Sequence, residues 1–172
     1  GTEVSVLPVG TGSIANDLAI SFITPPWGAI YCHHDAHIMV DEANGPEFFS
    51  GGAKLADLPA EHGRLDPETV RVAAMAFDPT DIHHPMRAAL SITQATEWGT
   101  LYSVDQVKAL GAVARDLDLA FHMDGARFAN AVAALDCSPA ELTWKSGVDV
   151  LSFGATKNGC MAVEALIVFG EK

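Results

Sequence analysis

Apolar runs and amphipathic stretches alternate along the chain. Short, continuously apolar runs predict buried strands at 4–8, 29–32, 88–92, 119–122, 148–153 and 165–169. Helices are predicted between them, at 14–22, 103–116 and 126–135, with Ser13 as the expected N-cap of the first and a Ser103–Gln106 capping box on the second. This alternation predicts an α/β fold, a mostly parallel sheet flanked by helices on both faces.

The composition is that of an ordinary folded domain. The chain has 172 residues, 49% of them hydrophobic, and we find no domain boundary within residues 1–172. The net charge of -12 argues against nucleic acid or an anionic membrane as partner. Three widely spaced cysteines without a CxxC motif, and no apolar run of membrane-spanning length, lead us to expect a soluble, cytoplasmic protein. Both ends lie next to predicted strands, so we expect the chain to be part of a longer protein.

Polar residues follow the predicted strands at the point where each strand ends. In a parallel sheet these carboxyl ends share one edge, where ligands bind. The residues expected there are Gly12 and Ser13 after the first strand, His37 after the second, Gln94 and Thr96 after the third, Asp124 and Arg127 after the fourth, and Lys157 after the fifth. Their convergence predicts a single site.

Lys157 follows the apolar run 148–153 and is flanked by the small residues Gly154, Ala155 and Gly159. Desolvation at the end of a buried strand favours the neutral form of an amine, which is the form that bonds to an aldehyde. On this stretch alone, a solvated lysine in a loop is an equal alternative.

The segment Gly10-Thr-Gly-Ser13 precedes a predicted helix. The free N–H groups of a first helical turn, together with the Ser13 hydroxyl, suit a phosphate group. The segment matches neither Walker A nor the GxGxxG fingerprint, so a nucleotide is not indicated. A plain glycine turn with a serine cap explains it equally well.

Asp124 ends a strand in which His122 is the other polar residue, so its carboxylate needs a cationic partner. Arg127, three residues later, is the partner in a purely structural alternative. In the functional interpretation, Asp124 faces a cationic heterocycle and the guanidinium fork of Arg127 binds a substrate carboxylate.

Three histidines, His33, His34 and His37, stand close together in the sequence. No HExxH motif or other compact zinc spacing accompanies them, and we predict no metal site. Two of them are expected to be solvated loop residues, and His37 is the one placed to point into the site.

A phosphate-binding turn, an aspartate and a strand-end lysine, in this order, meet the needs of one cofactor, pyridoxal 5'-phosphate (PLP). Its aldehyde needs an amine, its phosphate needs a helix N-terminus, and its protonated pyridine nitrogen needs a carboxylate.

Two segments, His122-Met-Asp-Gly-Ala-Arg-Phe-Ala-Asn-Ala131 and Ser152-Phe-Gly-Ala-Thr-Lys157-Asn-Gly, resemble the low-specificity L-threonine aldolases, which are PLP-dependent enzymes of fold type I. Gly12-Ser-Ile-Ala-Asn16, Asp35-Ala-His-Ile38 with Glu42, and 90–100 support the likeness. The resemblance implies a PLP-dependent lyase. Its small-molecule substrates would be β-hydroxy-α-amino acids such as L-threonine and L-allo-threonine, cleaved to glycine and an aldehyde.

The resemblance also implies a role for each site residue. Lys157 would bind the cofactor aldehyde covalently, Asp124 would keep the pyridine nitrogen protonated, and Gly12–Ser13 would hold the phosphate. Arg127 would contact the substrate carboxylate. His37 would stack on the ring and act as the base that takes the β-hydroxyl proton.

The sequence departs from the family pattern in two ways. Thr96 stands where many members have a second histidine, so we expect a substrate contact through its hydroxyl and no two-histidine mechanism. Family members also carry an additional N-terminal segment and a C-terminal small domain. Residues 1–172 are therefore expected to be an incomplete PLP-binding large domain, and the full-length protein a homo-oligomer, a dimer or tetramer. The alternatives are another PLP-dependent β-eliminating lyase or racemase, and a non-catalytic fragment.

Overall fold

The computed structural model describes residues 1–170, which form one sheet of seven strands in the order β1-β7-β6-β5-β4-β2-β3. From β3 to β6 across the sheet, neighbouring strands are parallel, whereas β7 runs antiparallel to both β6 and β1. The predicted α/β fold with a mostly parallel sheet is confirmed. The strands are β1 (Val4–Val9), β2 (Gly28–His33), β3 (Lys54–Leu58), β4 (Met86–Thr93), β5 (Ala120–Gly125), β6 (Val150–Gly154) and β7 (Glu164–Phe169).

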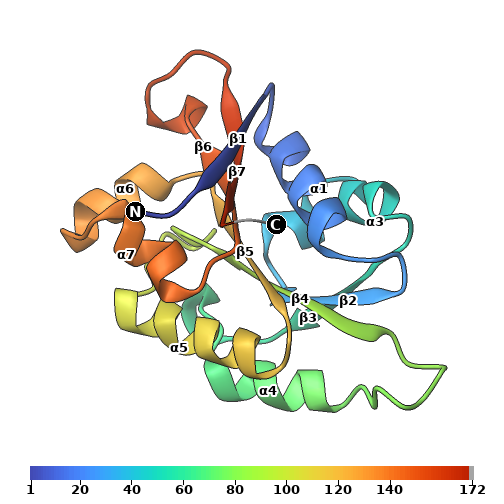
Figure 1. Ribbon diagram of the computed structural model, residues 1–172. Coiled ribbons are helices and arrows are strands. Elements are labelled where there is room, and N and C mark those ends of the chain that lie inside the picture. Colours follow the sequence, from blue (N-terminus) through green and yellow to red (C-terminus); the bar gives the residue numbers. More distant parts are fainter. Residues whose placement is uncertain (171–172) are drawn as a thin grey trace.

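Helices cover both faces of the sheet, with α1 and α3 on one side and α4 and α5 on the other (Figure 1). The Ser103–Gln106 capping box is confirmed. The N-cap of α1 is Thr11 and not Ser13, because Thr11 has an extended backbone and its Oγ1 accepts a hydrogen bond from the Ile14 N–H. The helices are α1 (Gly12–Ile23), α2 (His37–Val40), α3 (Gly45–Phe49), α4 (Pro67–Met75), α5 (Val104–Asp116), α6 (Phe128–Leu135) and α7 (Pro139–Leu142).

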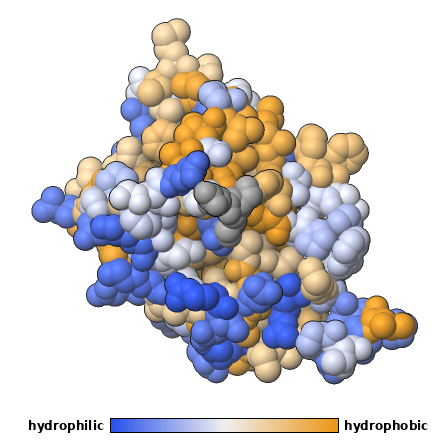
Figure 2. Space-filling model, in the orientation of Figure 1, coloured by the Kyte–Doolittle hydropathy of each residue, from blue (hydrophilic) through white to orange (hydrophobic). Residues whose placement is uncertain are grey.

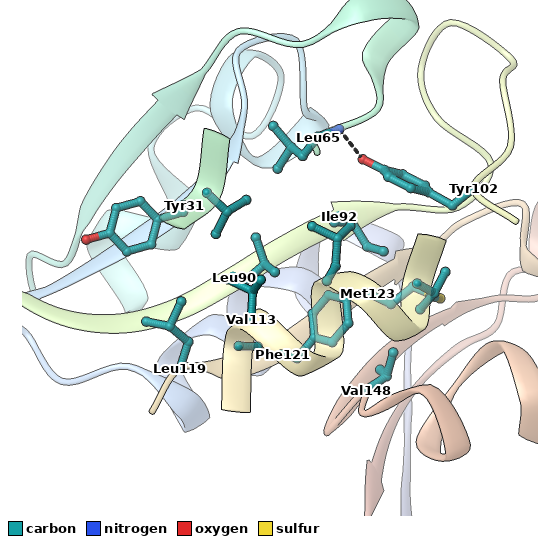
Figure 3. Packing of buried hydrophobic residues seen from close by; sticks show 14 of the residues in the cluster. Tyr31, Leu65, Leu90, Ile92, Tyr102, Val113, Leu119, Phe121, Met123 and Val148 are labelled. Carbon is teal, nitrogen blue, oxygen red and sulfur yellow. Dashed lines mark hydrogen bonds between the residues drawn. The ribbon is translucent and has the colours of Figure 1, made fainter. Parts of the chain in front are cut away.

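The larger hydrophobic cluster lies on the α4–α5 side of the sheet, where Leu90, Phe121 and Met123 are fully buried (Figure 3). Burying a side chain of this size stabilises the fold by about 1.5–3 kcal/mol. At the edge of the cluster, the buried Tyr102 hydroxyl accepts a hydrogen bond from the Leu65 N–H at 2.8 Å. The core therefore fixes β4 and β5, whose ends carry site residues.

The sheet edges differ from the sequence prediction. The first strand was expected to be buried, but in the described part of the chain β1 pairs with β7 alone, and Val4, Val6 and Leu7 are 46%, 53% and 47% exposed. Hydrophobic residues gather on the surface where β1 and β7 lie (Figure 2). The opposite edge strand, β3, was not predicted, because it is short and all but one of its residues are exposed or partly buried. Within residues 1–170, no helix is long and apolar enough to span a bilayer.

Candidate active site

The N-terminus of α1 and the carboxyl ends of β4, β5 and β6 surround a cavity of ≈ 390 Å³. The sheet brings together at this cavity six of the eight residues singled out from the sequence, whereas Gln94 and Thr96 are buried and are not among its described lining residues. Those that line it are Gly12, Ser13, His37, Asp124, Arg127 and Lys157. The cavity is also lined by acidic residues that the sequence prediction did not include, Asp41, Glu97 and Glu164.

The first turn of α1 forms one wall of the cavity. Because Thr11 provides the cap, Ser13 lies inside the helix, at the cavity wall with Gly12. The first N–H groups of a helix have no partner within it, and the helix dipole adds a partial positive charge there. This wall of the cavity can hold an anion.

Asp124 lies at the end of β5 and is 5% exposed. Its Oδ1 accepts a hydrogen bond from the Ala126 N–H at 2.9 Å, and its Oδ2 accepts one from Asn16 Nδ2 at 2.9 Å. Within the described part of the chain, neither Arg127 nor any other cationic side chain forms an ion pair with it. The structural alternative of an Asp124–Arg127 ion pair is therefore not what the structure shows. A buried carboxylate without a cation is costly, which suits a site that receives a cationic group.

Arg127 precedes α6 and lines the cavity. Among residues 1–170, its guanidinium has no ion-pair partner within 4.0 Å. An unpaired guanidinium at a cavity wall can form two parallel hydrogen bonds with a carboxylate ligand. Its placement is compatible with the role expected from the sequence, which remains a prediction.

His37 begins α2, and its ring is linked to two buried polar side chains. His37 Nδ1 lies 2.7 Å from Glu42 Oε1, and the same oxygen accepts a hydrogen bond from Asn16 Nδ2 at 2.8 Å. Burial raises the pKa of Glu42, and the hydrogen bonds from Asn16 and His37 partly oppose that rise. The His37 side chain is 38% exposed, so it connects this buried network to the open cavity.

Lys157 belongs to a short turn after β6, the 3-10 helix η3 (Thr156–Asn158). The sequence led us to expect a desolvated lysine, but Lys157 is exposed, because the turn carries it past the buried end of the strand. The turn itself is fixed by Glu164 on β7, whose Oε2 accepts a hydrogen bond from the Ala155 N–H at 2.6 Å. The exposed Lys157 side chain therefore extends from a backbone turn that is held by a hydrogen bond to β7.

Gly154 joins the lysine turn to the segment that carries Asp124 and Arg127. A Cβ atom at Gly154 would lie 2.4–2.6 Å from backbone atoms of Ala126, closer than any side chain tolerates. Asn158 Nδ2 also donates hydrogen bonds to the Ala126 and Gly154 carbonyl oxygens. The absence of a side chain at Gly154 lets the two segments lie directly against each other.

Thr96 does not line the cavity formed by the described residues. It is 1% exposed, and its hydroxyl is hydrogen-bonded to Thr100 Oγ1 at 2.8 Å. The loop instead presents Glu97, whose Oε1 accepts hydrogen bonds from the His37 N–H at 2.9 Å and from Thr93 Oγ1 at 2.8 Å. The geometry therefore gives no support to a substrate contact by Thr96.

His33 is buried rather than solvated as expected, because it is the last residue of β2 and packs edge-on near the Trp98 ring. Together with His34 and Asp35 it brings possible metal ligands within 4.8 Å of one another. However, His33 Nδ1 accepts a hydrogen bond from the Asp35 N–H at 3.1 Å, which places the proton of the neutral ring on Nε2. That ring has no lone pair left for a metal.

The network residues Asn16 and Glu42 were not predicted as site residues. A sequence signal was present: Asn16 lies four residues after Gly12, on the same face of α1, and Glu42 follows His37 closely. What the sequence could not show is that Asn16 and Asp124, 108 positions apart, form a direct hydrogen bond.

Comparison with known proteins agrees with this geometry. A sequence model of the beta-eliminating lyase family matches residues 1–172. A low specificity L-threonine aldolase from a Pseudomonas species is 46% identical over 171 residues, which cover 99% of this chain and 49% of that protein. Its counterpart in Pseudomonas aeruginosa is 46% identical over 168 residues, covering 98% of this chain and 48% of that protein. The chain thus spans about half the length of these relatives.

Among solved structures, the threonine aldolase of Leishmania major superimposes with a TM-score of 0.88 at 26% identity. The match covers 96% of this chain and 47% of that one. The whole-length family match and these likenesses lead to one conclusion: the chain belongs to the beta-eliminating lyase family.

Proposed function

We propose that this chain is the cofactor-binding part of a PLP-dependent aldehyde-lyase. Its substrates would be β-hydroxy-α-amino acids of the L-threonine and L-allo-threonine type, cleaved to glycine and an aldehyde. The relatives that are 46% identical are named for this activity, L-threonine aldolase. The single observation that carries the proposal is Asp124, a buried carboxylate in a cavity whose described residues supply it with no cation.

The residues of the cavity fit PLP. Asp124 would hold the proton on the pyridine nitrogen, Gly12–Ser13 would bind the phosphate at the α1 N-terminus, and the exposed Lys157 amine would bond to the aldehyde carbon. When bound, the cofactor supplies an electron sink for the bond that is cleaved.

The chain's own residues would then position the substrate and move its proton. Arg127 would bind the substrate carboxylate through its guanidinium fork. His37 would take the proton from the β-hydroxyl group, and the electrons of that O–H bond would form the carbonyl of the aldehyde as the Cα–Cβ bond breaks. Its Nε2 is suited to this step because Nδ1 faces Glu42.

We further propose that residues 1–172 are the large domain of a longer, homo-oligomeric protein. The relatives are about twice as long as this chain, which supports the first part. A cytoplasmic location is proposed because Cys32, Cys137 and Cys160 are all free thiols.

The decisive experiment is to incubate the chain with PLP, reduce it with borohydride, and map the modified residue by mass spectrometry. Labelling should occur at Lys157 and be lost in Lys157→Ala, while the matched control Lys145→Ala should keep it. Labelling spread over surface lysines and unchanged in Lys157→Ala would refute the proposal. Glycine release from L-threonine, compared with pyruvate release from L-serine, then separates an aldolase from a β-eliminating lyase.

A further inference from the structure

We propose that Glu42 is a positioning residue that holds His37 in the Nδ1–H tautomer, and that Asn16 joins this pair to Asp124. The inference rests on the proposed function and deepens it. It assigns a role to Glu42 and Asn16, which are not among the expected cofactor contacts. It also places His37, the proposed base, and Asp124, the carboxylate expected to face the pyridine nitrogen, in one hydrogen-bond network.

The contact between Glu42 and His37 determines where the ring proton lies. The Glu42 side chain is 0% exposed, and its Oε1 lies 2.7 Å from His37 Nδ1. Oε1 also accepts a hydrogen bond from Asn16, and an ionised carboxylate has no proton to donate, so His37 Nδ1 is the donor. The lone pair of a neutral His37 is then on Nε2. A base must present this lone pair to the proton that it takes.

Asn16 uses its two amide protons on two different carboxylates. Nδ2 donates to Glu42 Oε1 at 2.8 Å and to Asp124 Oδ2 at 2.9 Å. This orientation leaves Asn16 Oδ1 buried without a hydrogen-bond partner among the described residues. A flipped amide would aim its oxygen at both carboxylates. The observed orientation therefore places the donors where two buried negative charges need them.

Other charged groups near His37 act on different atoms. Glu97 accepts a hydrogen bond from the His37 backbone N–H and not from the ring. Asp124 reaches His37 through Asn16 and Glu42, while Asp41, Arg127 and Lys157 lie on the walls of the same cavity. Glu42 is thus the carboxylate in direct contact with the ring in the described part of the chain.

The first test needs no cofactor. Long-range ¹H–¹⁵N NMR of the ¹⁵N-labelled chain, recorded at alkaline pH, reports which ring nitrogen carries the proton, and His37→Phe assigns the signals. The wild type should show Nδ1–H, and Glu42→Leu should shift His37 toward Nε2–H. Glu68→Gln, which removes an exposed charge on α4, should change nothing. An Nε2–H tautomer in the wild type, or an unchanged tautomer in a folded Glu42→Leu, would overturn the proposal.

The second test uses the PLP-loaded chain and separates positioning from simple stability. Loss of an oriented base should lower kcat for cleavage of L-threonine about 100-fold in Glu42→Leu, with KM changed less than about threefold. Glu42→Gln, which keeps an oxygen acceptor and is the variant to use if Glu42→Leu does not fold, should recover about tenfold. Equal kcat values in Glu42→Gln and Glu42→Leu would count against positioning through the hydrogen bond.

Asn16→Leu tests the link to Asp124. This variant should weaken PLP binding and leave the His37 tautomer unchanged, because Glu42 still contacts Nδ1, whereas Glu42→Leu should shift the tautomer alone. If PLP binding in Asn16→Leu equals that of the wild type, the link is refuted. Failure of Lys157 labelling would remove the proposed function but leave the tautomer result standing, so the two failures are distinguishable.

Discussion

Replacing His122 by glutamine should remove a large part of the acid sensitivity of this fold. His122 is fully buried in the centre of the sheet, with Nδ1 2.9 Å from Ser91 Oγ and Nε2 2.9 Å from Ser152 Oγ. Desolvation lowers the pKa of His122 from 6.5 to about 4, and the negative charge of Asp124 only partly opposes that fall. The ring is therefore neutral in the folded protein near neutral pH, with both nitrogens paired.

The size of the effect follows from the difference between folded and unfolded pKa. Since the unfolded chain binds a proton near 6.5 and the folded chain near 4, lowering the pH through this window stabilises the unfolded state. Each pKa unit corresponds to about 1.4 kcal/mol. His122 should therefore make the fold about 2 kcal/mol less stable at about pH 5, and about 3 kcal/mol less stable at about pH 4, than at neutral pH.

The assay is urea unfolding of wild type and His122→Gln across this pH range. Glutamine can donate to one serine and accept from the other, and it does not titrate. Other groups also destabilise the fold when acid protonates them, because their pKa values are lowered: Asp66, Asp78 and Glu141. The informative quantity is therefore the difference in unfolding free energy between the two proteins. That difference should change by about 2 kcal/mol in favour of the variant between about pH 7 and about pH 5. If the unfolding free energies of the two proteins changed in parallel with pH, His122 would be protonated in the folded state or would not be desolvated.

Three further predictions follow from the site and its supports. Asp124→Ala should reduce lyase activity at least about 100-fold, and Thr96→Ala less than about fivefold, measured as glycine release; equal losses would show that the carboxylate has been misplaced. Gly154→Ala should destabilise the fold by about 1–3 kcal/mol in denaturant unfolding, because its Cβ would overlap the Ala126 backbone; unchanged stability would refute that close contact. Burial raises the pKa of Asp17, and the charge of Glu47 raises it further. The fold therefore loses stability as the pH rises through the raised pKa of Asp17 and its carboxyl group ionises. Asp17→Asn should therefore raise Tm at about pH 8 and leave it nearly unchanged at about pH 4; the same gain at both pH values would contradict this cause.

The parallel part of the sheet could be predicted because its strands are buried on both faces. A strand such as β4, most of whose residues are buried, reads as a continuous apolar run. Edge strands carry no such signal. Among residues 1–170, β3 pairs only with β2, and its exposed and partly buried positions follow no regular alternation, so nothing in Lys54–Leu58 distinguishes it from a loop. β1 is apolar for another reason, since its exposed residues lie along a surface rather than in the core.

The positions of site residues could be predicted where the end of a strand fixes them. They could not be predicted where contacts within a loop decide whether a side chain is buried or exposed. The ends of the strands placed Asp124 and His37 at one edge, because parallel strands share an edge whatever their order. The exposure of Lys157 depends on how far the η3 turn extends beyond β6, and the burial of Thr96 depends on Thr100. Both are properties of loop geometry, which periodicity does not encode.

The charges around the cavity are arranged in a way that would orient an amino-acid substrate. Arg127 follows Ala126, whose backbone lies against Gly154, so the guanidinium and the Lys157 turn come from two segments in direct contact. Glu97 is bound to the first residue of α2, so an acidic group accompanies His37. A substrate carboxylate is attracted toward Arg127 and repelled by Glu97 and Asp41. Arg127 and His37 line the same cavity, so a carboxylate held by Arg127 would share that cavity with the proposed base.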